Sequence, residues 1–388
     1  MHNLPRISLF LAIVSSVLFL LHYYIWARLI RDTGLADPLR ASLTVALFLL
    51  GFMIPLGMIF NRLAPRALTT PFMWIIYTWL GMAFLLNVLL AVTDLARLLA
   101  VALPLRLQGQ SLNPERRLFL AKMVGLGVVA ANLGMSLVGF LGASASAIQV
   151  KRLKVALTGL PQSLEGFRMV QITDIHVGPT IGRHFIETIV KEVNALQPDL
   201  VAITGDLMDG TLAQLMDGVE PLKQLAAKEG VYFVTGNHEY YTGDVDEWLA
   251  WLSSIGIRPL RNERVTIRQG FDLAGTDDIS AHGPGHQQDI PKALAGRTGD
   301  RPVVLMAHQP RSFKEAKSLG VDLQLAGHTH GGQIYPFNFV VGLFEPYVRG
   351  LYREGKSQLY VSCGTGYWGP PMRLGVPAEI TEITLTRG

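Results

Sequence analysis

The first part of the chain carries four long stretches of apolar residues, separated by short segments that contain arginine. None of the four contains Asp, Glu, Lys or Arg, and each is close to the roughly 20 helical residues that cross a hydrocarbon core about 30 Å thick. They cover residues 7–26, 41–60, 72–92 and 123–141. Buried helices of a soluble protein are the alternative, but four in succession between basic loops favour membrane spans. The pattern predicts a transmembrane region over residues 1–150.

Two strongly polar residues, His22 and Asn87, interrupt these stretches. No charged residue accompanies them within the spans, and transport paths through membranes are usually marked by such charges. We therefore expect both side chains to form interfacial or interhelical hydrogen bonds and not to line a transport path.

The charges indicate how the spans are oriented. Residues 1–150 hold 11 Lys and Arg but 4 Asp and Glu, whereas residues 151–388 hold 23 and 26. The basic excess lies between the spans, so it indicates membrane topology and not nucleic-acid binding. The loops after the first and third spans contain eight Lys or Arg, against six on the opposite side. This bias predicts that the second half of the chain is extracytoplasmic, and in a bacterium the membrane is then the inner or plasma membrane.

A short motif before the fourth span supports the same orientation. Arg116 and Arg117 precede a weakly apolar span that ends in Ala-Ser-Ala-Ser-Ala over residues 143–147. The arrangement is similar to a twin-arginine export signal, with cleavage after Ala145 or Ala147 left open. An ordinary basic flank followed by a helix end rich in small residues is the alternative.

From residue 151 the pattern changes to short β-rich runs that end directly in polar residues. The first runs alternate with amphipathic helical stretches, which predicts a central sheet covered by helices, with the polar residues gathered at the strand ends. These runs are residues 169–173, 200–204, 231–235 and 303–307. Later runs lack clear helices between them and predict a second, more antiparallel sheet. They are residues 265–267, 272–274, 358–362 and 380–386.

Candidate metal ligands lie in the motifs directly after the β-rich runs. The motifs are Asp174-Ile175-His176, Gly205-Asp206-Leu207-Met208-Asp209, Gly236-Asn237-His238-Glu239, His308 and Gly327-His328-Thr329-His330. Mixed nitrogen and oxygen donors suit Mn, Fe or Zn better than Ca or Mg. Cys363 is the single cysteine, which excludes an intrachain disulfide and a cysteine-rich zinc site.

At these motifs the chain resembles the calcineurin-like metallophosphoesterase superfamily, over about residues 154–388. With membrane spans ahead of the domain, it is similar to membrane-bound bacterial phosphohydrolases and to transmembrane proteins with a metallophosphoesterase domain. The resemblance implies a four-layer α/β/β/α sandwich over residues 151–388. It also implies a metal-dependent phosphoric ester hydrolase with two divalent metal ions, for which Mn²⁺ is the first choice and Fe or Zn are alternatives.

The resemblance also implies a role for each motif residue. One metal ion is assigned to Asp174, His176 and His330, and the other to Asn237, His308 and His328, with Asp206 bridging both. A hydroxide between the metals is then the nucleophile of an in-line phosphoryl displacement. His238 protonates the leaving oxygen or stabilises the phosphate oxygens, and Asp209 orients His238 without touching the metals. Glu239 has no assigned chemistry and is expected to form a salt bridge or begin a helix.

The substrate is less well defined by the sequence. The apolar run over residues 335–344 comes directly after the last ligands and either contacts lipid, if exposed, or is buried under the second sheet. Arg349, Arg353 and Arg373 are candidates for binding phosphate, whereas solvated surface charges are the alternative. His282 and His286 are expected at the surface and not among the ligands.

The sequence supports the hypothesis of a membrane-anchored phosphohydrolase that cleaves a phosphoester, phosphodiester or pyrophosphate bond, with a phosphorylated membrane lipid as its substrate. A nucleotide or nucleic-acid phosphodiesterase and a protein phosphatase are the rival enzymes. The net charge of −3 over residues 151–388 disfavours nucleic acid as a partner. A membrane sensor or transport protein with a regulatory metal domain is the alternative from another class.

Overall fold

The computed structural model describes residues 4–102, 113–297 and 301–388 and divides the chain into two compact units. The N-terminal unit is Met1–Val138 and the C-terminal unit is Gly139–Gly388. The last turn of the fourth long helix therefore belongs to the C-terminal unit, whereas the sequence pattern placed the change of domain at residues 150–151. Arg106, which contributed to the charge count, lies outside the described residues.

The N-terminal unit contains four helices that are long and apolar enough to cross a membrane, as the sequence predicted. They are α1 (Leu4–Trp26), α2 (Asp37–Leu63), α3 (Arg66–Ala102) and α4 (Pro114–Gly142), and a π-helical turn (Ala27–Arg31) extends α1. Asp94 of α3 accepts a hydrogen bond from Tyr24 and pairs with Arg28 at 2.8 Å. Trp79 of α3 donates to His22 of α1 at 3.0 Å, which confirms the interhelical role expected for that histidine. Asn87 instead donates to the carbonyl of Ala83 within its own helix.

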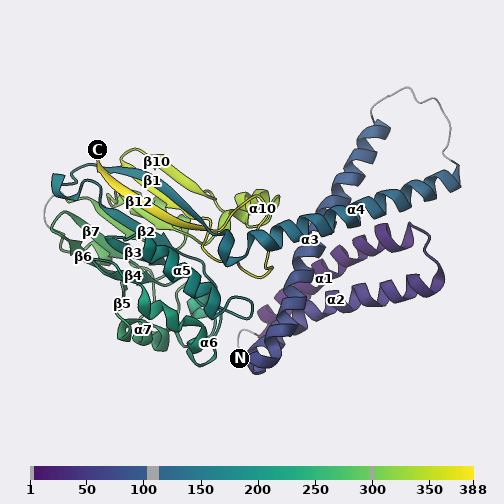
Figure 1. The fold of residues 1–388 in the computed structure, drawn as a ribbon, viewed down its shortest axis with the longest axis horizontal. Helices are drawn as coiled ribbons and strands as arrows, with labels where there is room; N and C mark the ends of the chain where they lie inside the picture. Colours follow the sequence, from purple (N-terminus) through teal and green to yellow (C-terminus); the bar gives the residue numbers. More distant parts are fainter. Residues whose placement is uncertain (1–3, 103–112, 298–300) are drawn as a thin grey trace. The chain divides into compact units, whose positions relative to one another are not determined.

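The C-terminal unit is built on two six-stranded sheets (Figure 1). The first has the order β1-β12-β2-β3-β4-β5, with β12 antiparallel to β2 and all other neighbours parallel. Its strands are β1 (Gln149–Leu157), β2 (Arg168–Ile172), β3 (Leu200–Thr204), β4 (Val231–Val234), β5 (Ile257–Pro259) and β12 (Glu379–Arg387). The second has the order β10-β11-β9-β8-β7-β6. Its strands are β6 (Glu263–Ile267), β7 (Phe271–Gly275), β8 (Val303–Met306), β9 (Leu323–Ala326), β10 (Gly350–Glu354) and β11 (Ser357–Val361).

Two expectations about the sheets were wrong. The run at residues 303–307 forms β8 of the second sheet, whereas the run at residues 380–386 forms part of β12 in the first sheet. The second sheet is more antiparallel than the first, as predicted, with two antiparallel pairs of five against one of five. The physical reason for the errors is that β12 pairs over nine residues with β1, more than 200 residues away in the sequence. Local patterns of apolar residues carry no information about such distant pairing.

Three buried layers of apolar side chains hold the four structural layers together. Helices α5 (Arg183–Ala195), α6 (Leu212–Val219) and α7 (Val245–Ser254) cover the outer face of the first sheet. The inner faces of the two sheets pack on each other through a shared core that includes Met169, Val304 and Tyr360. Helices α8 (Ile290–Leu294) and α9 (Phe313–Ser318) cover the second sheet. This arrangement is the predicted α/β/β/α sandwich.

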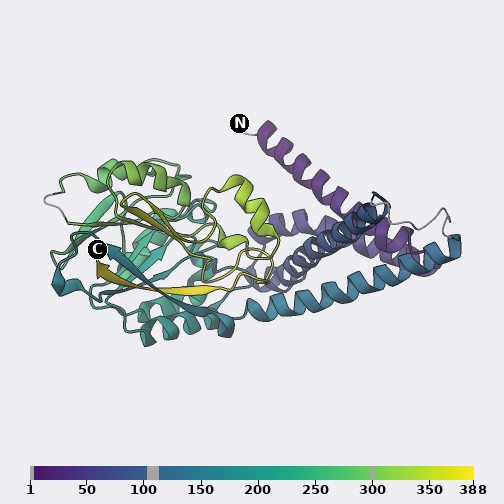
Figure 2. The same ribbon diagram turned by 90° about the horizontal axis from the view of Figure 1, so that it is seen from above.

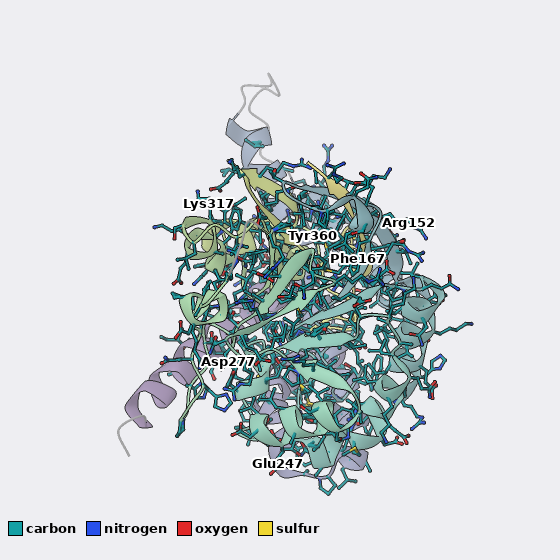
Figure 3. All side chains as sticks on the ribbon, turned by 90° about the vertical axis from the view of Figure 1, so that its left-hand side faces the viewer. Arg152, Phe167, Glu247, Asp277, Lys317 and Tyr360 are labelled. Carbon is teal, nitrogen blue, oxygen red and sulfur yellow. The ribbon has the colours of Figure 1, made fainter. Side chains whose placement is uncertain are left out.

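Figure 3 shows these layers, with Glu247 on α7 and Lys317 on α9 at the two outer sides and Tyr360 among the strands between them. Helix α10 (Phe337–Phe344) comes after β9 and a short turn. Six residues, 143–148, lead from the end of α4 to the start of β1, and the ribbon can be traced through them in Figure 2.

Candidate dinuclear metal site

The polar motifs meet at one edge of the sandwich because they come directly after parallel strands of both sheets. The loops after β2, β3 and β4 carry the first three motifs, and the loops after β8 and β9 carry the last two. Carboxyl ends of parallel strands lie along the same edge of a sheet, so the fold brings side chains from five distant segments together. The structure places all nine residues singled out from the sequence in this cluster: Asp174, His176, Asp206, Asp209, Asn237, His238, His308, His328 and His330.

The backbone of the cluster is strained. Five of the ten described non-glycine residues with positive φ belong to it, namely Asp174, His176, Asp206, His328 and His330. Such conformations cost free energy and concentrate at functional sites. Glycine is required beside them, because a Cβ at Gly236 would collide with Asp206 and one at Gly327 with Asp174.

The ligand atoms form groups around the carboxylate of Asp206. On one side, Nε2 of His176 lies 3.0 Å from Nε2 of His330, which lies 3.6 Å from Oδ1 of Asp174. On the other side, Nε2 of His308 lies 3.2 Å from Oδ2 of Asp206, and His328 belongs to the same group. Oδ2 of Asp206 also lies 3.8 Å from Nε2 of His176. Asp206 therefore faces both groups.

Hydrogen bonds on the far side of the rings orient these side chains. The carbonyl of Thr204 lies 2.8 Å from Nδ1 of His308, and Oδ1 of Asp209 lies 2.9 Å from Nδ1 of His176. A proton on Nδ1 satisfies each bond and leaves Nε2 free to bind a cation. Asp209 thus contacts the ligand His176 as well as His238.

Comparison with known proteins identifies the family. The model of the calcineurin-like phosphoesterases matches residues 167–332. An uncharacterized metallophosphoesterase of Helicobacter pylori is 38% identical over 275 residues, which are 70% of this chain and 73% of that protein. This chain belongs to the calcineurin-like phosphoesterase family.

Two relatives that are named as transmembrane proteins are also similar to this chain. The bovine "Transmembrane protein with metallophosphoesterase domain" is 43% identical over 290 residues, covering 71% of this chain and 64% of that protein. The zebrafish protein of the same name is 43% identical over 249 residues, covering 61% of this chain and 57% of that protein. The chain thus spans less than two thirds of the length of these relatives.

The residues of this family member fit a pair of cations. Two atoms of the cluster, Oδ1 of Asn237 and Nε2 of His308, are among the buried side-chain atoms without a hydrogen-bond partner. Leaving such atoms unpaired costs roughly 1–3 kcal/mol each, and a cation would satisfy both. Nδ2 of Asn237 donates to the hydroxyl of Tyr241 at 2.8 Å, which orients the amide with its oxygen unpaired.

The charge state of the histidines varies across the site. Burial and the neighbouring His308 lower the pKa of His328 to about 3, so its imidazole is neutral, as a metal ligand requires. Burial also lowers the pKa of His238, but Asp206 and Asp209 outweigh it and raise that pKa to about 9. A protonated His238 at neutral pH is the form that donates a proton.

Glu239 has a structural function that the sequence did not reveal. It is 1% exposed, and its carboxylate accepts hydrogen bonds from the backbone amides of Asp206, Leu207 and Gly236. It therefore joins the loops after β3 and β4. The expected helix start is confirmed, because Glu239 lies in the first turn of a short 3-10 helix (His238–Tyr240). The expected salt bridge was wrong, since backbone amides satisfy the buried carboxylate. Burial and Asp206 raise its pKa to about 7.

The three candidate phosphate-binding arginines have different environments. Arg373 is 3% exposed and donates to backbone carbonyls, so it is no phosphate ligand at the surface. Arg353 is exposed on β10 and donates to Gln358. Arg349 is exposed beside the turn that carries His330, since a Cβ on Gly331 would lie 3.4 Å from its Cδ. Of the two exposed arginines, Arg349 is therefore the candidate for binding phosphate.

Two aromatic side chains that sequence reasoning missed flank His238. The ring centroids of Tyr241 and Trp368 lie 4.6 Å and 5.9 Å from that of His238, and both rings are about half exposed. Neither position carries a sequence signal, because Trp368 reaches the site through long-range folding. His282 is exposed as expected, but His286 is buried between Asp246 and Arg261 and is not at the surface.

Proposed function

We propose that this protein is a membrane-anchored hydrolase that cleaves a phosphomonoester, phosphodiester or pyrophosphate bond with two divalent cations. The observation that carries the proposal is the position of Asp206, whose carboxylate faces two groups of ligand atoms. Mn²⁺ is our first choice of cation, with Fe or Zn as alternatives, because the donors mix imidazole, amide and carboxylate.

The residues of each group would hold one cation, and Asp206 would contact both. The two sets are Asp174, His176 and His330 on one side, and Asn237, His308 and His328 on the other. When bound, the cations lower the pKa of water and neutralise charge on the transferring phosphoryl group.

His238 would supply the proton for the leaving oxygen. Its Nδ1 is held by Asp209 at 2.7 Å, which leaves Nε2 directed to the reaction. The side chain keeps a small exposed surface, unlike His308, which is fully buried. Asp209 positions both His238 and the ligand His176, and it contacts neither cation in this proposal.

We place the substrate at the membrane surface, as a phosphorylated lipid. Helix α10 supports this choice, since it contains no buried residue and its apolar side chains are exposed, Leu343 by 80% and Phe344 by 70%. Of the two alternatives from the sequence, burial under the second sheet was therefore wrong. Six residues connect α4 to β1, and fully extended they cover at most about 20 Å.

A nucleotide substrate is the second candidate, because of the two aromatic rings beside His238. Stacking of a base on an aromatic side chain contributes about 1–3 kcal/mol per base. Tyr241 and Trp368 offer such surfaces at the position where the leaving group would lie. The negative charge of residues 151–388 still disfavours long nucleic acids.

The test is a hydrolysis assay with the purified full chain in detergent and Mn²⁺. The panel contains membrane phospholipids, lipid-linked sugar nucleotides and free nucleotides, with products identified by mass spectrometry. We expect turnover of a lipid phosphate, loss of turnover in Asp206→Ala, and wild-type turnover in His184→Ala, whose side chain is 93% exposed. Turnover of nucleotides alone would favour the second candidate. Absence of turnover over the whole panel would favour a sensor or transport protein.

We also propose that the C-terminal unit lies on the extracytoplasmic side of a bacterial inner or plasma membrane. The support is the eight-to-six distribution of Lys and Arg in the loops. Alkaline phosphatase fused after Gly388 should then be active, and green fluorescent protein at the same position should be dark. Fluorescence without phosphatase activity would reverse this topology.

A further inference from the structure

The end of helix α4 packs directly on the segment that contains Arg373. The backbone amide of Arg373 donates to the carbonyl of Gly139 at 2.7 Å. A Cβ at Gly142 would lie 2.6 Å from the carbonyl oxygen of Arg373. Gly127 and Gly134 on the same helix would meet nothing within 4 Å. Of the glycines of α4, Gly142 is therefore the one at which a Cβ would collide with a neighbouring backbone atom.

Arg373 connects this turn to a proposed metal ligand. Its guanidinium donates to the carbonyl of Gly366 through Nε at 2.9 Å and to the carbonyl of His330 through Nη1 at 3.4 Å. Its Nη2 lies 3.2 Å from Nδ1 of His330. The same side chain thus contacts both the backbone and the ring of His330.

A buried arginine held in this way is costly. Arg373 is 3% exposed, and among the described residues no carboxylate forms an ion pair with it. Burying a charge without a counterion is unfavourable, and a neutral side chain of similar size would avoid that cost. The guanidinium offers five donors in a fixed plane, which suits the holding of several carbonyl groups at once.

The turn that carries His330 is what Arg373 fixes, through its hydrogen bond to the carbonyl of His330. Nδ1 faces Arg373, so Nε2 faces His176 at 3.0 Å and Asp174 at 3.6 Å. The backbone of His330 has a φ of 50°, which its neighbours must stabilise. Loss of the guanidinium would release the carbonyl of His330 and with it the turn that carries the ring.

We propose that Arg373 is a positioning residue for His330, and that Gly139 and Gly142 of helix α4 hold Arg373 in place. The end of the fourth membrane helix is then a structural part of the metal site. A shift of α4 moves the Arg373 segment and with it the ligand His330. This inference rests on the metal site proposed above, and it adds a mechanical connection from the membrane helix to one of the two cations.

The test compares two glycine-to-valine variants on the same helix. Gly142→Val places a side chain against the carbonyl of Arg373, whereas the matched control Gly134→Val adds the same side chain in open space. Bound Mn²⁺ is measured on the full chain in detergent by elemental analysis and titration calorimetry. We expect Gly134→Val to bind two ions as the wild type does. Gly142→Val should bind one of them about 10–100-fold more weakly, the range seen for loss of an outer-shell partner.

Variants of Arg373 provide the second arm. Arg373→Met should weaken the same ion by a similar factor, and Arg373→Lys should restore part of the affinity, since one ammonium reaches fewer carbonyls. A general loss of packing would not be rescued by lysine. Thermal unfolding shows whether each variant is folded. If Gly142→Val does not fold, the variants of Arg373 test the connection instead.

Wild-type affinity for both ions in Gly142→Val and in Arg373→Met would overturn the connection. The proposed function as a hydrolase would still stand after that outcome if the wild type turns over its substrate. Conversely, a wild type that binds two ions and hydrolyses nothing in the panel refutes the proposed function, while weaker binding of one ion in the variants still supports the connection.

Discussion

The carboxylate of Asp209 lies 2.7 Å from Nδ1 of His238 through its Oδ1 atom. Burial raises the pKa of Asp209, but the adjacent His176 and His238 lower it well below the usual range, so this carboxylate is ionised and can only accept. The proton of the bond therefore lies on Nδ1 of His238. Nε2 is therefore the ring nitrogen of His238 that is directed away from Asp209.

Asp209 contacts both His176 and His238, so replacing Asp209 should have a different effect from replacing His238. His238→Ala should bind two Mn²⁺ ions and lower kcat by about 10²–10⁴-fold, the usual contribution of general acid catalysis. Asp209→Ala should lower kcat and also weaken Mn²⁺ binding, since Asp209 holds the ligand His176 at 2.9 Å. Titration calorimetry and steady-state kinetics on the same samples separate the two effects. Equal loss of metal from both variants would contradict the assignment of His238 as a group that binds no cation.

We predict that replacing Glu239 lowers the stability of the protein without changing the charge of the residues that would hold the cations. In Glu239→Gln, an amide nitrogen faces the backbone amides of Asp206, Leu207 and Gly236, and a donor cannot accept from other donors. The free energy of unfolding should fall by about 1–3 kcal/mol for the unpaired amide. Chemical unfolding of the full chain measures it, with the exposed Glu247→Gln as control. An unchanged midpoint would show that the amides find other partners.

The strand ends and the metal-site cluster could be predicted from the sequence because each motif comes directly after an apolar run. The run fixes where the strand ends, and the carboxyl edge of a parallel sheet then gathers the polar residues of the next loop. Arg373 and Trp368 could not be predicted, because they lie far beyond the last motif and reach the site through the fold. The pairing of β12 with β1 was hidden for the same reason. Glu239 lay inside a recognised motif, but only the structure shows that its partners are backbone amides.

The contacts of the last α4 turn predict that the chain is not cut after Ala145 or Ala147. Ala143 is buried in the core that covers the first sheet, and the carbonyl of Gly139 binds the amide of Arg373. Cleavage would separate these residues from the unit to which they belong. We expect mass spectrometry of the protein purified from membranes to give an uncut chain across residues 139–150. A mature form that begins at Ser146 or Ile148 would establish the export-signal interpretation instead.

The exposed face of α10 predicts that lipid and soluble substrates respond differently to the same change. Phe339 and Phe344 are 63% and 70% exposed, and burying such a side chain in lipid gains roughly 1.5–3 kcal/mol. Phe339→Ser/Phe344→Ser should therefore lower kcat/KM on a lipid phosphate in vesicles by at least about tenfold.

The activity of the same double variant on p-nitrophenyl phosphate should stay within about twofold of the wild type, because a small ester reaches the site without α10. The control is Met216→Ser, an exposed apolar side chain on α6, which should change neither activity. An equal loss on both substrates would mean that the phenylalanines support the fold of the turn after His330. In that case the lipid proposal would lose the helix that supports it, whereas a selective loss would place α10 in the bilayer surface during catalysis.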